Sequence, residues 1–312
     1  VASGRALAQV EDVVRNAVLP YYANSHTQAS FCGAYITRLR EAARAEVARL
    51  TGAGPGDSVV FTGSGSTAAI NRIVALLDLA TLVSQGRQVI VLVGPYEHHS
   101  NLLPWRESGA TVTEIPEGTH GGPCPDALRS ALEEAAKADL VVGAFSAASN
   151  VTGIVTDVDA VTRLLKSYGA LAVWDYGCGA PYMPMDMKSG TGAAKDAIVF
   201  SPHKFPGGPG ASGVMIVRNA IVTRCTPSLP GGGTVSFVSP WGHSYSDRIE
   251  SREEAGTPNV VGDIRDLANA PFDSGHDAFH FGDALRRGRR VLWGLGRTLC
   301  VVLARIEALR DR

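Results

Sequence analysis

Short apolar runs alternate with amphipathic stretches along most of the chain. Several of the apolar runs lack any alternation with polar residues, which is typical of strands covered on both faces. The runs are Val59–Thr62, Val89–Val93, Val112–Ile115, Leu140–Phe145, Leu171–Trp174, Ile198–Phe200 and Gly213–Val217. We interpret them as the strands of one seven-stranded sheet.

The stretches between many of these runs repeat apolar residues at the helical period. Residues 34–50 place arginine and glutamate on one face and, on the other, Ile36, Leu39, Ala43, Val47 and Leu50. Further helices are predicted at Thr67–Leu79, Asp126–Ala138 and Asp157–Tyr168. Strand–helix alternation of this kind predicts an α/β fold with a mostly parallel sheet sandwiched by helices.

The chain divides into three parts by its sequence character. Residues 34–264 carry the strand–helix pattern and are predicted to form the main domain, preceded by an N-terminal segment, 1–33. The tail, 265–312, begins irregularly and turns basic at Arg286–Arg290, and Val291–Leu309 has the pattern of a helix. We interpret the basic run as a solvated face.

Composition excludes several classes of protein. Among 312 residues, 45% are hydrophobic and 19% charged, which is typical of a globular protein. A net charge of -1 gives no reason to expect nucleic acid or a membrane surface as a partner, and no apolar run approaches the length of a membrane span. The five cysteines are scattered without a CxxC pair, so we expect a reducing compartment, the cytoplasm or, as an open alternative, an organelle.

Polar, glycine-rich segments directly follow several of the predicted strands. They are FTGSGST, VGPYEHHSN, FSAASNVTG, WDYGCGAP and FSPHKFPGG. Ligands bind at the carboxyl ends of the strands in sheets of this kind. The segments therefore predict one active site at that edge of the sheet.

Two of these segments carry residues suited to aldehyde chemistry. Lys204 follows a buried strand, and partial removal from water would make its amine a usable nucleophile for an aldehyde. Asp175 follows Leu171–Trp174, and pyridoxal chemistry needs an acidic partner for the pyridine nitrogen. The alternatives are an ordinary loop lysine and a turn or capping aspartate.

The other segments offer anion-binding and stacking groups. Gly63–Thr67 leads into a predicted helix, whose first N–H groups suit a phosphate, although an N-cap without a ligand explains the same pattern. His98 could stack on an aromatic ring or move protons. The His98–His99 pair also raises a metal site, but no further ligands stand at a suitable spacing. Asn150 is either a hydrogen-bond donor to a phenolate oxygen or a turn residue.

Taken together, the segments resemble class V aminotransferases, the fold-type I pyridoxal-phosphate group that includes the cysteine desulfurases. The matching pieces, in the family's order, are FTGSGSTAAIN, EHHSNLLPW, SNVTG, WDYG, SPHKFPGGPGASGVMI and EEAGTPN. The resemblance runs from about Tyr22 to Ile264 and implies the cofactor pyridoxal 5'-phosphate (PLP).

The resemblance also implies a role for individual residues. Lys204 would form the Schiff base with PLP and then shuttle the substrate's α-proton. Asp175 would pair with the pyridinium nitrogen, His98 would stack on the ring face, and Asn150 would contact the ring hydroxyl. Lys204, His98 and Asp175 would thus be catalytic. The phosphate would be held by Ser66, Thr67, Ser201 and His203.

Three more residues concern the substrate and a second subunit. Thr257 resembles the family's residue that reaches a neighbouring subunit's phosphate, which implies a homodimer. Asn24 and His26 match the segment on the substrate side, and the implied substrate is a small amino acid.

The sequence departs from the desulfurase pattern in three ways. Cys178 stands where desulfurases carry glutamine, and a thiol is the poorer hydrogen-bond donor. The tail does not resemble the family's small C-terminal domain, so we expect that domain to be incomplete or divergent. Cys300 lies in an apolar helical pattern, whereas persulfide chemistry needs an exposed, low-pKa thiol.

These observations favour a PLP-dependent enzyme that acts on an L-amino acid. Desulfurase-like removal of sulfur or selenium and amino transfer remain equally open. The alternative is a PLP-binding but catalytically impaired homologue that serves as a dimerisation partner. A nucleotide-binding module is disfavoured, because the chain has neither a P-loop nor a dinucleotide fingerprint.

Overall fold

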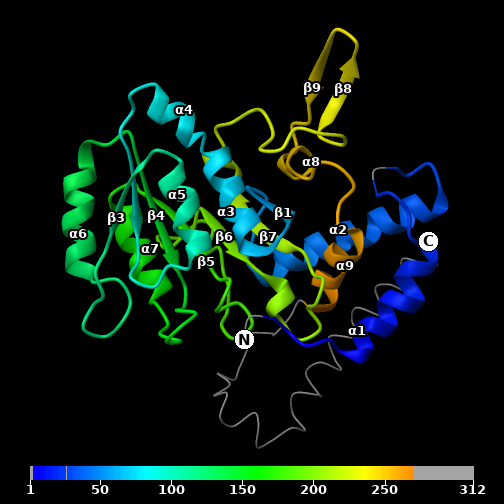
Figure 1. Cartoon of the computed structure of the whole chain (residues 1–312), viewed down its shortest axis with the longest axis horizontal. Coiled ribbons are helices and arrows are strands. Elements are labelled where there is room, and N and C mark those ends of the chain that lie inside the picture. The colour runs from blue at the N-terminus through cyan, green and yellow to red at the C-terminus, as the bar shows by residue number, and fades with distance from the viewer. Residues whose placement is uncertain (1–2, 26, 270–312) are drawn as a thin grey trace, which may run out of the picture.

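A central sheet with helices on both faces forms the body of the protein (Figure 1). The computed structural model describes residues 3–25 and 27–269. The α/β architecture predicted from the sequence is confirmed. The predicted helix Val291–Leu309 and the expected small C-terminal domain lie outside the described residues.

The sheet has seven strands in the order β1-β7-β6-β5-β4-β2-β3. Strand β7 runs antiparallel to both of its neighbours, and the other neighbouring pairs are parallel. The mostly parallel sheet is therefore confirmed. The strands are β1 (Asp57–Gly63), β2 (Val89–Val93), β3 (Thr111–Glu114), β4 (Leu140–Ser146), β5 (Leu171–Asp175), β6 (Ala197–Phe200) and β7 (Gly213–Arg218).

The helices follow the predicted alternation, with one division that the sequence pattern did not indicate. The N-terminal helices are α1 (Ala8–Val13), the π-helical η1 (Val14–Val18), the 3-10 turn η2 (Leu19–Tyr21) and α2 (Phe31–Leu50). Between the strands lie α3 (Gly65–Leu76), α4 (Leu79–Ser84), η3 (His99–Asn101), α5 (Leu103–Glu107), α6 (Pro125–Glu134), η4 (Ala135–Lys137) and α7 (Val158–Ser167). The later ones are η5 (Pro202–Lys204), η6 (Asn219–Ile221), α8 (Ile249–Glu253) and α9 (Val260–Asn269). The predicted helix Thr67–Leu79 was too long, because Asp78 adopts a left-handed conformation (φ 53°) that ends it.

Two apolar layers cover the two faces of the sheet. Helices α2, α6, α7 and α9 pack on one face, and α3, α4 and α5 pack on the other. Along β2, Leu92 belongs to the first layer while Val91 and Val93 belong to the second. This double cover explains why the strands are apolar at successive positions.

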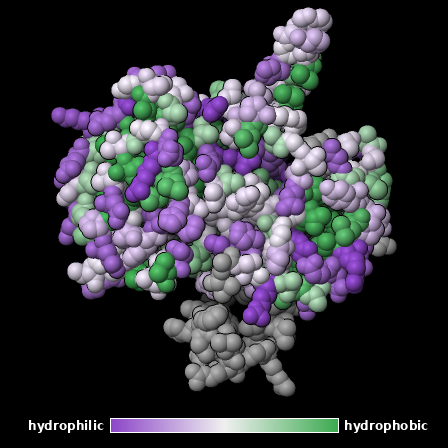
Figure 2. All heavy atoms as spheres, viewed as in Figure 1, coloured by the Kyte–Doolittle hydropathy of each residue, from purple (hydrophilic) through white to green (hydrophobic). Residues whose placement is uncertain are grey.

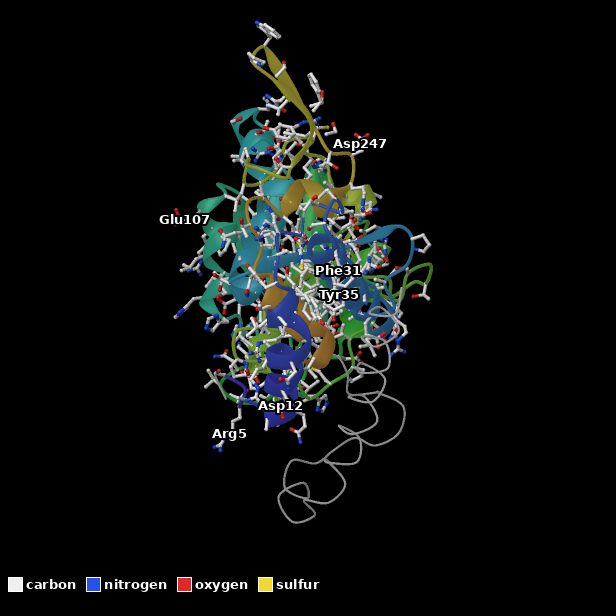
Figure 3. The ribbon with its side chains drawn as sticks, turned by 90° about the vertical axis from the view of Figure 1, so that its right-hand side faces the viewer. Arg5, Asp12, Phe31, Tyr35, Glu107 and Asp247 are labelled. Atoms are coloured by element: carbon white, nitrogen blue, oxygen red, sulfur yellow. The ribbon has the colours of Figure 1, made fainter. Side chains whose placement is uncertain are left out.

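A hairpin that the sequence analysis did not predict projects from the body (Figures 1 and 2). It consists of β8 (Val235–Ser239) and β9 (Gly242–Tyr245). Its large apolar side chains are exposed, Phe237 by 61% and Trp241 by 92%. At the start of α2, the exposed Phe31 stacks on the buried Tyr35 with ring centroids 6.3 Å apart (Figure 3).

Buried ion pairs join α2 to the segment that follows the hairpin. Glu254 accepts hydrogen bonds from Arg40 Nη2 at 2.8 Å and from Arg44 Nη1 at 2.8 Å. Glu254 Oε1 also accepts the Phe61 N–H of β1 at 2.8 Å. Arg40 Nε donates to Asp263 of α9 at 2.8 Å, and all four charged side chains are buried. The two arginines hold the pKa of Glu254 below its ordinary value despite burial, which raises it.

Removing Glu254 should destabilise the fold strongly. Glu254→Ala removes the buried carboxylate that Arg40 and Arg44 share and leaves Arg40 with Asp263 as its acidic partner, a change that costs about 3–5 kcal/mol. Glu41→Ala is the matched control, because Glu41 is half exposed and its loss should cost less than about 1 kcal/mol. The measurement is the free energy of unfolding in urea, and equal losses in the two variants would contradict the role of the buried pair.

Candidate active site

The carboxyl ends of β4, β5 and β6 meet at one edge of the sheet and carry polar side chains there. Ser146, the last residue of β4, pairs in register with Asp175, the last residue of β5. Strand β6 lies next to β5 and ends at Phe200, directly before the segment Ser201–Lys204. The predicted convergence of loops at this edge is thus present.

Asp175 is a buried carboxylate at the centre of this edge. Burial raises its pKa, and this effect outweighs the hydrogen bonds from Gly177 N–H and from Ser66, which lower it. Lys204 and His98 are near enough that their charges also lower this pKa. The structure therefore brings together the acid, the amine and the imidazole that the sequence analysis selected.

Two buried serines connect the start of α3 to the end of β6. The Ser66 N–H donates to Ser201 Oγ at 2.9 Å, and the two hydroxyls lie 2.9 Å apart. The N-cap residue Ser64 makes no side-chain hydrogen bond to α3, and the first N–H groups of a helix have no intrahelical partner. Hydroxyls and N–H groups in this arrangement form a site for an anion.

Lys204 and His203 lie in the turn η5, and both are partly buried. Burial lowers the pKa of His203, and the charge of Lys204 lowers it further. The N-terminal segment crosses this turn, because Gly4 N–H donates to the His203 carbonyl at 2.8 Å and Gly207 N–H donates to the Arg5 carbonyl at 2.7 Å. Sequence reasoning gave no sign that residues so early in the chain hold the lysine turn.

His98 is exposed and is held from one side by Ser100. Ser100 N–H donates to His98 Nδ1 at 3.2 Å, and the Ser100 hydroxyl lies 3.0 Å from the same nitrogen. The Ser100 hydroxyl also lies 2.7 Å from Thr67 Oγ1, which links His98 to the first turn of α3. Ser100 was not predicted as a site residue, although its position two residues after His98 is the signal that could have identified it.

Asn150 lies in the exposed turn after β4. The Cys178 thiol, which follows β5, contacts the carbonyl of the neighbouring Ser149 at 3.7 Å. Asn150 and Cys178 therefore flank the same part of the edge. Cys178 is partly buried.

The remaining predicted residues are Thr257, Asn24 and His26. Thr257 is exposed and, among the described residues, makes no hydrogen bond to the other predicted site residues. Asn24 is exposed, and the neighbouring Ser25 accepts a hydrogen bond from Arg40. His26 lies outside the described residues.

A separate cavity of about 590 Å³ adjoins the site between α3 and α5. Thr67, His99 and Ser100 line it together with Arg224. Lys204 and Asp175 do not line it, so it is not the place where their chemistry would occur. Within residues 3–25 and 27–269, no three histidine, cysteine or acidic side chains are grouped as metal ligands, and no helix there is long and apolar enough to cross a membrane.

Comparison with known proteins decides the family. The family model for aminotransferase class-V matches residues 1–267. The chain belongs to this family. It is 34% identical to a probable cysteine desulfurase of Aeropyrum pernix over 260 residues, which cover 81% of this chain and 60% of that protein. It is 32% identical to a probable cysteine desulfurase of Vibrio cholerae, over 83% of this chain and 63% of that protein.

A solved structure shows the same relationship within the aminotransferase class-V family. The cysteine desulfurase of Thermococcus onnurineus superposes with a TM-score of 0.73 and 27% identity, over 95% of this chain and 67% of that one. The resemblance inferred from the sequence motifs is therefore confirmed. The chain spans about 60% of the length of the curated relatives that it matches.

The free energy of unfolding should fall as the pH rises from 5 to 8. Burial raises the pKa of Glu97, which lies in the loop after β2, from 4.5 to about 7. It raises the pKa of Asp263 from 3.8 to about 6. Each contributes stability that is complete below its unfolded pKa and is lost as the pH rises through its folded pKa.

His203 opposes this trend, because its lowered pKa makes folding more favourable as its unfolded form loses a proton near pH 6.5. One partly buried histidine does not offset two carboxyls, so we expect a net loss of about 3 kcal/mol. Urea unfolding at pH 5, 6.5 and 8 measures it. A stability that is constant or rises over this range would contradict the prediction.

Proposed function

We propose that this protein is a PLP-dependent enzyme that acts on a small L-amino acid. Family membership supplies the cofactor class, and the observation that carries the proposal is the grouping of Lys204 and His98 around the buried Asp175. Among the described residues, no other partly buried lysine lies at the carboxyl edge of the sheet near a buried carboxylate such as Asp175.

The residues present fit PLP on two counts. Among the described residues, the hydrogen bonds to the buried Asp175 carboxylate come from one backbone N–H and one serine side chain, which leaves acceptor capacity for a pyridinium N–H. Gly65 and Gly177 also keep this edge open, because a Cβ at either position would meet Ser201 Oγ or Ser66 Oγ at less than 3 Å. A ring beside Asp175 and a phosphate beside Ser66 suit these two features.

Bound PLP acts as an electron sink that stabilises a carbanion at the substrate's α-carbon. Lys204 Nζ would attach the cofactor as a Schiff base and later take up the substrate's α-proton. Asp175 would accept a hydrogen bond from the protonated ring nitrogen, and His98 would stack on the ring face. The amides of the first turn of α3, with Ser66, Thr67, Ser201 and His203, would bind the phosphate, and Asn150 would donate to the ring hydroxyl.

The proposed type of reaction follows from the names of the relatives. Those relatives are cysteine desulfurases, which favours removal of sulfur from cysteine over amino transfer. Cys178 stands in the segment after Asp175 and contacts the Ser149 carbonyl. The desulfurase reaction predicts alanine and sulfide from cysteine, whereas amino transfer predicts a keto acid only when an amino acceptor is present.

A homodimer is part of the proposal. Thr257 is exposed and, in the described part of the chain, makes no hydrogen bond to the other predicted site residues, which suits a contact with a second copy. The exposed apolar side chains of the β8–β9 hairpin are also suited to burial against a second copy. The alternative function, a PLP-binding dimerisation partner without turnover, predicts the same cofactor spectrum but no product from any amino acid.

Lys204→Ala should abolish covalent attachment of PLP. The wild-type protein mixed with PLP should show a visible absorption band that borohydride reduction fixes to the protein. The matched control is Lys137→Ala, which removes an exposed lysine in η4 and should leave that band intact. If Lys204→Ala retained a reducible band equal to the wild type, the proposed attachment site would be wrong.

Gly65→Ala should weaken PLP binding at least about tenfold. Gly65 has φ +61°, and an added Cβ would lie 2.8 Å from Ser201 Oγ and 2.9 Å from His203 Cε1, displacing two of the groups assigned to the phosphate. Gly169→Ala imposes a similar backbone penalty, of about 1 kcal/mol, at φ +73° with no atom within 4 Å of the added carbon. Fluorescence titration with PLP compares them, and similar affinities in both variants would reject Gly65 as part of the phosphate site.

A further inference from the structure

Glu97 occupies the centre of a hydrogen-bond cluster behind the candidate site. Its Oε1 accepts the N–H groups of Ser146 at 2.8 Å and Gly94 at 3.2 Å. Its Oε2 accepts the Ser146 hydroxyl at 2.7 Å and the Asn101 side-chain amide at 2.5 Å. These four donors fill the acceptor positions of one carboxylate.

A buried tryptophan fixes the direction of the hydrogen bonds in this cluster. Trp105 has no exposed surface, and its indole N–H donates to Asn101 Oδ1 at 3.0 Å. An indole nitrogen can only donate, so Asn101 must turn its oxygen to Trp105 and its NH2 group to Glu97. The residue at position 97 must therefore present an acceptor to Asn101.

The same cluster is connected to both of the groups assigned to the ring of PLP. Ser146 pairs in register with Asp175 across β4 and β5, and the charge of Asp175 acts on Glu97. His98 follows Glu97 directly in the chain. Because hydrogen bonds hold Glu97 at the end of β4, the backbone of the adjacent His98 has a fixed position relative to Asp175.

We infer that Glu97 is a positioning residue that holds His98 at the ring of PLP by joining the β2 loop to the end of β4 through the chain Trp105–Asn101–Glu97–Ser146. The inference rests on the proposed function, since it assumes that a PLP ring lies between His98 and Asp175. Glu97 acts through its neighbours and does not itself touch the ring.

The geometry makes a specific demand on substitutions. Glu97→Gln keeps the shape and one oxygen for the two backbone N–H groups, but its NH2 group would face the NH2 group of Asn101. Rotating Asn101 would only move the conflict to Trp105, so one buried donor stays unpaired. Asn101→Asp, added to Glu97→Gln, restores a donor–acceptor pair at both contacts and keeps one carboxylate in the cluster.

The test compares Glu97→Gln, Asn101→Asp and the double variant at pH 8, where the wild-type carboxyl is ionised. We expect Glu97→Gln to weaken PLP binding about tenfold and to change the circular dichroism of the bound chromophore, which reports how the ring is held. Asn101→Asp should also weaken binding, because two carboxylates then meet. The double variant should recover the affinity to within about threefold, together with the wild-type dichroism.

A purely structural role is distinguished by the unfolding midpoint, which would fall without any change in the dichroism. The inference is overturned if Glu97→Gln binds PLP with wild-type affinity and dichroism, or if the double variant is as impaired as the single one. If Glu97→Gln does not fold, Ser146→Ala replaces it. It removes one donor to Glu97 Oε2 and should change the dichroism, and an unchanged signal would overturn the inference.

Failure of the proposed function gives a different result. In that case the wild-type protein itself shows no borohydride-reducible band that depends on Lys204. If the band forms in the wild type and in Glu97→Gln with equal affinity and dichroism, only the role of Glu97 is rejected.

Discussion

The burial of the Asp175 carboxylate at the end of a central strand is the constraint on which the candidate site depends. A carboxylate removed from water is costly unless donors and positive charges surround it. Here the Gly177 N–H, Ser66, Lys204 and His98 supply them, yet burial still raises the pKa of Asp175. The Ser66 hydroxyl comes from the start of α3, and the two positive charges come from the loop after β2 and from the turn η5, so several elements at this edge contribute to stabilising one acidic group.

The sheet topology explains how distant parts of the chain meet at this group. Parallel strands deliver their carboxyl ends to one edge, and each loop that leaves that edge adds one or two polar side chains. Gly65 and Gly213 permit the closest of these approaches, because a Cβ on Gly213 would lie 2.5 Å from the Gly65 backbone. The first turn of α3 can therefore rest against β7 and reach Ser201.

The sequence predicted the strands and the site loops well, because both depend on local patterns. Apolar runs revealed strands covered on both faces, and Asp175 and Lys204 were found as polar residues directly after such runs. Contacts that depend on tertiary approach were missed. The pairing of Gly4 with the turn of Lys204 joins residues 4 and 203 through backbone atoms, which leave no trace in side-chain patterns. The left-handed conformation of Asp78, which divides the predicted helix, is likewise a property of the backbone that side-chain patterns do not reveal.

Two lysines at opposite ends of β6 show why position in the sheet matters more than burial. Lys195, just before the strand, is 1% exposed, and burial lowers its pKa. Lowered pKa alone would select it as the nucleophilic amine, but its Nζ donates to Asp159 at 3.1 Å at the amino end of the strand. Lys204, just after the strand, is less buried, and its charge, like that of His98, lowers the pKa of Asp175. An amine reacts with a bound aldehyde only where the rest of the ligand is also bound, and in sheets of this kind ligands bind at the carboxyl ends of the strands, where Lys204 lies.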